Sequence, residues 1–246
     1  MRIFVIIALI ALLGAAPFLF TKNKPILETK KMSTRQMMYI VTFSALAIVI
    51  GFFEIPIGFI GVKLDLSEVI ILMAFLVLGF KNASYVIVLR SLVRMILPSK
   101  TAMETDMLWK ALGEVIAILA SYLIIFSYFL TKKVLKIKEK PLMIAVPTEK
   151  GNIDLKVFVV ASIITPILLT LGMTVFHTLI TMPMYLSGNE HFFITSLLND
   201  SKYVDNNILS IIKTIIVMFG LVNVIKGIIS PIVFLMIKPQ IEKIIT

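Results

Sequence analysis

Residues 214–237 read TIIVMFGLVNVIKGIISPIVFLMI, an apolar run long enough to cross a bilayer that carries Asn223 and Lys226 near its middle. A lysine at that depth costs free energy, so it needs a physical reason. At helical spacing the polar and small residues of the run fall on one stripe, which consists of Gly220, Asn223, Gly227 and Ser230, with Lys226 beside it. This stripe is expected to face protein or a water-filled cavity.

Two explanations fit the buried lysine. Either Lys226 reaches the bilayer surface or pairs with a carboxylate for packing alone, or it belongs to a solute site inside a helical bundle. Every other face of the helix is Ile, Val, Leu, Met or Phe, and we favour the solute site.

The composition places the whole chain in the membrane. Of its 246 residues 59% are hydrophobic and 15% charged, and the mean hydropathy is +1.02, which is too apolar for a soluble domain of this length. The net charge of +10 comes from lysines clustered in a few loops, which is how membrane topology is encoded, so we exclude a nucleic-acid partner. With no cysteine and only two histidines, a thiolate or histidine-rich metal site is excluded as well.

The charge pattern predicts an all-α transmembrane fold, a six-helix bundle with one extra N-terminal hydrophobic helix. Residues 1–21 form that extra helix, which we expect to be retained as an anchor rather than cleaved as a signal peptide, because the lysines that follow it place the next loop in the cytoplasm. The bundle, residues 35–238, makes a multi-pass protein of the cell membrane with a cytoplasmic C-terminus. Its predicted spans are residues 36–57, 69–80, 82–97, 109–128, 157–182 and 214–237.

Small residues recur along the first span of the bundle. Ser44, Ala47 and Gly51 are spaced three and four apart, so they form a row where another helix can come close. The row serves either packing within the bundle or docking of a partner protein.

Charged residues also lie in and after the first outer loop, residues 58–68. Asp65 and Glu68 are spaced as a capping pair for the next helix, which would account for both acids but not for Lys63. Further along, Arg90 and Arg94 share one helix face that lipid cannot accept. These arginines either pair with an acid such as Glu114 or line a cavity for a polar or anionic solute.

The span 157–182 has one broad face of serine and threonine, most of which we expect to bond their own backbone. His177, near the outer end of that face, is the exception and a candidate site residue. The chain has no phosphate-binding loop, zinc-protease motif or nucleophile elbow, so we expect a binding subunit without its own ATPase rather than an enzyme.

Over residues 35–238 the chain resembles the substrate-binding S component of energy-coupling factor (ECF) vitamin transporters, most closely the riboflavin type. The matching motifs are VKLDLSE at 62–68, LRSLVR at 89–94, GE at 113–114, Pro183-Met-Tyr185 and LVNVIKG at 221–227. The last motif is the most specific, and the resemblance assigns vitamin contacts to Asn223 and Lys226. It also implies a membrane-embedded T component and two ATPase subunits as partners, with the row of small residues as the docking face.

Two positions depart from the riboflavin pattern. His177 stands where that type has an asparagine, and Ala117 and Ile118 stand where it has another. Histidine can donate and accept hydrogen bonds as an amide does, so riboflavin still fits. The arginines would equally suit a carboxylated vitamin such as folate, pantothenate or nicotinate.

The predicted site is a cavity that opens to the outside. Asn223, Lys226 and His177 form one wall, Arg90, Arg94 and Glu114 form another, and loop 58–68, with Lys63 and Asp65, forms a lid. The rival hypothesis is an intramembrane enzyme that uses Glu114 or His177 as a general base. A purely structural membrane subunit is the third alternative.

Overall fold

The computed structural model describes residues 32–53, 55–56, 63–97, 107–137, 155–181 and 220–245, together with Lys213 and Ile216. Its elements are α2 (Thr34–Gly51), β1 (Ile55–Pro56), β2 (Lys63–Leu64), α3 (Ser67–Ile96), α4 (Met107–Val134), α5 (Leu155–Phe176), the π-helical turn η2 (His177–Thr181) and α9 (Leu221–Ile245). The predicted N-terminal helix, residues 1–21, lies outside the described residues.

The described part of the chain is helical apart from one short strand pair. Five of its helices are long and apolar enough to cross a membrane, which agrees with the predicted all-α transmembrane class. β1 and β2 were not expected, and they pair as antiparallel strands with Ile55 opposite Leu64 and Pro56 opposite Lys63. This pair joins the end of α2 to the start of α3.

α3 is a helical hairpin rather than one rod. Gly79 has φ 80° and ψ 174°, a conformation that only glycine adopts without strain, and it breaks the helix into two arms. In a straight helix Ser67 and Arg90 would lie about 35 Å apart at 1.5 Å per residue, yet Arg90 Nη1 donates to Ser67 Oγ at 2.9 Å. The arms therefore run back along each other.

The sequence predicts two helices here, joined at Lys81 and Asn82, and the break lies slightly earlier, at Gly79. Each arm has fewer than the roughly 20 residues that a helix needs to cross a bilayer. The count of six spans therefore stays a prediction.

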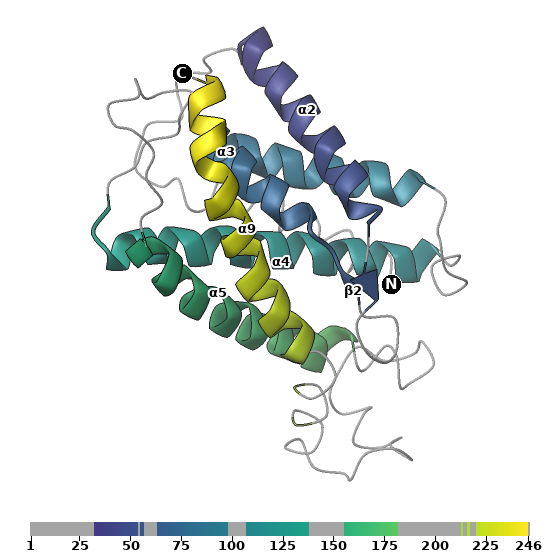
Figure 1. The fold of residues 1–246 in the computed structure, drawn as a ribbon. Helices are drawn as coiled ribbons and strands as arrows, with labels where there is room; N and C mark the ends of the chain where they lie inside the picture. The colour runs from purple at the N-terminus through teal and green to yellow at the C-terminus, as the bar shows by residue number, and fades with distance from the viewer. Residues whose placement is uncertain are drawn as a thin grey trace, which may run out of the picture.

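Four helices, α3, α4, α5 and α9, contact one another in a closed circuit, and α2 packs against α3 (Figure 1). Contacts run from α2 to α3, from α3 to α4, from α4 to α5 and from α5 to α9, and α9 returns to α3. The closest approach is between α5 and α9, where a Cβ on Gly227 would lie 2.6 Å from the Cα of Pro166. Glycine is required at this crossing because any side chain would push the two backbones apart.

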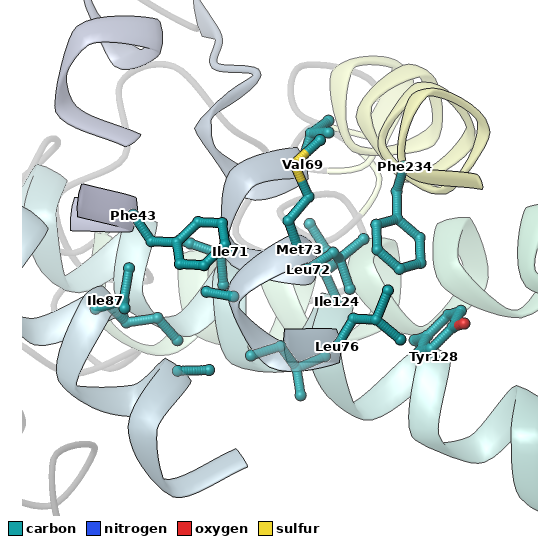
Figure 2. Close-up of a cluster of buried hydrophobic side chains, with 14 of the residues drawn as sticks. Phe43, Val69, Ile71, Leu72, Met73, Leu76, Ile87, Ile124, Tyr128 and Phe234 are labelled. Atoms are coloured by element: carbon teal, nitrogen blue, oxygen red, sulfur yellow. The ribbon is translucent and has the colours of Figure 1, made fainter. Parts of the chain in front are cut away.

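The core of the bundle is an apolar cluster supplied mainly by α3 and α4, with smaller contributions from α2, α5 and α9. Figure 2 shows Phe234 of α9 pointing toward Tyr128 of α4, beside Leu72 and Leu76 of α3. The rings of Phe234 and Tyr128 meet edge to face at 5.1 Å, a favoured aromatic geometry. This packing fixes how α3, α4 and α9 lie against one another, and so positions the charged residues that the same helices carry.

Candidate functional site

Six charged side chains from four parts of the chain meet in one buried cluster. Asp65 precedes α3, Glu68 lies in its first arm, and the second arm carries Arg90 and Arg94. α4 contributes Glu114, and α9 contributes Lys226. We call this set the charged cluster; its members are Asp65, Glu68, Arg90, Arg94, Glu114 and Lys226. All but Arg94 are less than 10% exposed.

Three ion pairs link the cluster. Lys226 Nζ lies 2.5 Å from Glu68 Oε1. Arg94 joins two acids, with Nη1 2.8 Å from Asp65 Oδ2 and Nε 3.2 Å from Glu114 Oε1. These pairs connect the start of α3 to its own second arm, to α4 and to α9. Two predicted pairings are thus present, an acid beside Lys226 and an acid beside one of the two arginines.

Arg90 behaves differently from Arg94. It has no exposed surface, and its Nη1 donates to the hydroxyl of Ser67 at 2.9 Å. Its Nε and Nη2 have no hydrogen-bond partner among the residues that the structure describes. A buried donor without a partner is costly, so this side of Arg90 calls for an explanation.

Asp65 lies where the loop enters α3 and is held ionised. Burial alone would raise its pKa, but the positive charges of Lys226, Arg90 and Arg94 outweigh burial and lower the pKa to about 2. Its Oδ1 also accepts a hydrogen bond from the Ser67 N–H at 2.7 Å. Asp65 therefore binds the N–H of the first residue of α3 and pairs with Arg94, although the N-cap position itself is Leu66.

The prediction that Glu68 completes a capping pair is wrong. Its carboxylate is fully buried and pairs with Lys226 on a helix distant in sequence. Sequence reasoning left Glu68 out of the candidate site because the spacing of Asp65 and Glu68 already had a local explanation. The signal that could have identified it is the one that marked Lys226, a charge inside an apolar run, VIILMAF after Glu68.

The polar stripe of α9 is buried, as its periodicity predicts. Gly220, Asn223, Gly227 and Ser230 all face the bundle. Asn223 lies one turn before Lys226, and its Nδ2 has no hydrogen-bond partner within the described ranges. The two α9 residues that the sequence marked are therefore on the interior side, next to the charged cluster.

Two other candidate residues stay predictions. His177 begins the π-helical turn η2 and is 4% exposed, with its ring 6.3 Å from that of Phe176. Such turns often occur at functional sites. Lys63 lies in β2, where its backbone pairs with Pro56, and its side chain is outside the described residues. A role for either in a binding site is untested.

The row of small residues on α2 faces its own bundle. Ser44, Ala47 and Gly51 are buried in the helix that packs against α3. A Cβ on Gly51 would lie 3.0 Å from Arg94 Nη1, so the row ends beside the charged cluster. In the chain alone this arrangement agrees with internal packing, and a partner could reach the row only if α2 moved. Docking at this row stays untested.

The comparisons with known proteins identify a family. A family model described as ECF transporter, substrate-specific component, matches residues 35–238, which include all six residues of the charged cluster. No curated protein and no solved structure matches the chain. Substrate-specific components are transport subunits that bind a substrate in the membrane, and the family implies a T component and ATPase subunits as partners. The chain belongs to the family of ECF transporter substrate-specific components.

Proposed function

We propose that this chain is the vitamin-binding S subunit of an ECF importer and that its vitamin is riboflavin. The charged cluster is the observation that carries the proposal, because it gathers six ionisable side chains from α3, the residue Asp65 just before it, α4 and α9 inside the helical bundle. Ionisable groups within a membrane protein are rare and usually mark a path or a site for a solute.

Packing alone explains the cluster poorly. A buried ion pair returns little net stability compared with apolar residues of the same volume. Several polar atoms of the cluster also have no hydrogen-bond partner among the described residues, namely Glu68 Oε2, Arg90 Nε and Nη2, and Glu114 Oε2. The same holds for Asn223 Nδ2 beside the cluster. Unmatched donors and acceptors that converge from three helices are what a site needs in order to fix a polar solute.

The choice of riboflavin rests on the resemblance of LVNVIKG, residues 221–227, to the last-helix motif of the riboflavin type. In this proposal Asn223 and Lys226 contact the vitamin, His177 replaces an amide of that type, and the segment with Lys63 and Asp65 closes over the site. The site opens to the outside, and the C-terminus lies in the cytoplasm. Energy comes from the T component and two ATPase subunits.

Purified protein tests the proposal directly. We expect riboflavin carried through purification to colour the protein yellow, and calorimetry after removal of the vitamin to show tight rebinding. Asn223→Ala should weaken riboflavin binding at least tenfold, since a buried hydrogen bond to a ligand is worth about 1 kcal/mol or more. Asn82→Ala is the matched control, because the Asn82 amide already has a partner in the protein, the carbonyl of Leu78 at the turn of the α3 hairpin.

Other results of the binding experiment would lead to different conclusions about the function. If folate, pantothenate or nicotinate binds and riboflavin does not, the S-subunit assignment stands and the vitamin is wrong. If no vitamin binds, the proposed function is wrong. Turnover of a lipid or peptide that depends on Glu114 would instead support the rival hypothesis of an intramembrane enzyme.

A further inference from the structure

Only one of the three nitrogens of the Arg90 guanidinium has a hydrogen-bond partner among the described residues. Nη1 is taken by Ser67, whereas Nε and Nη2 have no hydrogen-bond partner among the described residues. In the planar guanidinium, Nε–H and one N–H of Nη2 point in the same direction, so together they form a two-pronged donor edge. A ligand that satisfies this edge must offer two acceptor atoms side by side.

The charge of the cluster limits what that ligand can be. Its three cations, Arg90, Arg94 and Lys226, are matched by its three acids, Asp65, Glu68 and Glu114. An added carboxylate would leave an uncompensated negative charge in a buried place, which is strongly unfavourable. A neutral ligand leaves the balance unchanged.

We propose that the Nε/Nη2 edge of Arg90 selects the ring of the solute, and that this ring is a neutral heteroaromatic with a carbonyl oxygen beside an unprotonated ring nitrogen. This inference rests on the proposed function and narrows the substrate to one chemical class. Arginine recognises guanine by the same geometry, with two parallel N–H donors on a carbonyl oxygen and the neighbouring ring nitrogen. The flavin ring offers two such edges, O4 with N5 and O2 with N1.

The other unmatched atoms of the cluster complement such a ring. Glu114 Oε2 is an acceptor without a hydrogen-bond partner in the described part of the chain, and it is suited to a ring N–H. Asn223 Nδ2 is a further donor. Because Arg90 has no exposed surface, the solute reaches the edge only when the residues that cover it move apart. Recognition by Arg90 therefore takes place in a closed, dry site, where hydrogen bonds discriminate most strongly.

Two deaza analogues of riboflavin test the proposed role of Arg90 by changing the ligand. 5-Deazariboflavin has carbon in place of N5, and 1-deazariboflavin has carbon in place of N1, so each removes one acceptor and leaves the shape unchanged. We expect one of them to bind the unmodified protein about tenfold or more weakly than riboflavin, because it leaves one Arg90 donor unpaired.

Substitutions of two arginines test the same role by changing the protein. Arg90→Lys keeps the charge but removes the planar donor pair, and Arg35→Lys is the matched control at an exposed arginine of α2. We expect Arg90→Lys to weaken riboflavin about tenfold or more and to bring riboflavin and the disfavoured analogue to equal affinity. Arg35→Lys should change neither value.

The outcomes separate this inference from the proposed function. If riboflavin binds, and either Arg90→Lys leaves its affinity unchanged or both deaza analogues bind as tightly as riboflavin, the role of Arg90 is wrong and the proposed function stands. If Arg90→Lys fails to fold, the analogue comparison on the unmodified protein still decides. If a carboxylated vitamin binds in place of riboflavin and Arg90→Lys abolishes that binding, the neutral class is wrong.

Discussion

The charged cluster and the apolar core share three helices, α3, α4 and α9, and follow opposite physical rules. On α3, Glu68 belongs to the charged cluster and Leu72, one turn later, belongs to the core; both have no exposed surface. On α9, Lys226 belongs to the charged cluster and Phe234 belongs to the core. The core gains stability from close packing of many atoms, and the charged cluster holds together only while each charge keeps its partner.

The comparison distinguishes two kinds of position along a single helix, those that pack apolar side chains and those that hold paired charges. Core positions should tolerate changes of similar volume, whereas positions in the charged cluster should tolerate no unmatched change of charge. Each of the following predictions tests that division by measuring both the free energy of unfolding in detergent and the affinity for riboflavin.

The largest effect on stability is expected for Glu68→Ala. It leaves the buried Lys226 without its acid, which should lower the free energy of unfolding by about 3–5 kcal/mol. Thermal and denaturant unfolding measure the loss. The double variant Glu68→Leu, Lys226→Met, which removes both charges, should recover most of the stability but not the binding. If the double variant does not recover stability, the Glu68–Lys226 pair is not the interaction that holds α3 to α9.

Phe234→Ala is the counterpart in the core. The ring is fully buried against Tyr128, and its removal leaves a cavity, so we expect a loss of about 3 kcal/mol. Because the charged cluster keeps all its pairs, the riboflavin affinity of the folded fraction should stay within about twofold. A large loss of affinity at unchanged stability would contradict the division between core and cluster.

Ala47→Leu distinguishes internal packing from partner docking on α2. Ala47 has no exposed surface, so a larger side chain should overpack the contact with α3 and lower stability by about 2 kcal/mol. Ala45→Leu is the control, at an exposed position of the same helix. If Ala47→Leu instead leaves stability and affinity intact and abolishes only transport by the complete importer, the row is a docking face.

The smallest of these effects is expected at the turn of the α3 hairpin. Gly79→Ala forces a side chain into a conformation with φ 80° and should cost about 1–2 kcal/mol. Gly113→Ala is the control, since its added Cβ would meet nothing within 4 Å in a regular helix, where alanine is favoured. Equal stability of the two variants would show that the turn at Gly79 is not required.

Sequence reasoning identified most of the charged cluster because charge inside an apolar run is a strong signal. It identified Lys226, Arg90, Arg94 and Glu114, and the stripe on α9, from periodicity and depth alone. It could not assign pairs, since partners from different helices meet only through tertiary packing. The strand pair was missed for that reason, and Glu68 was missed because its spacing from Asp65 had a local explanation.

The hairpin of α3 also bears on how the chain enters the bilayer. Within the charged cluster, its first arm and the residue before it supply Asp65 and Glu68, and its second arm supplies Arg90 and Arg94. These four charges sum to zero, so the two arms can insert together as a neutral unit before α4 and α9 have been synthesised. The charges that arrive later, on Glu114 and Lys226, again balance each other. In chain order the charged cluster therefore carries one unmatched negative charge from the synthesis of α4, which brings Glu114, until the synthesis of α9, which brings Lys226.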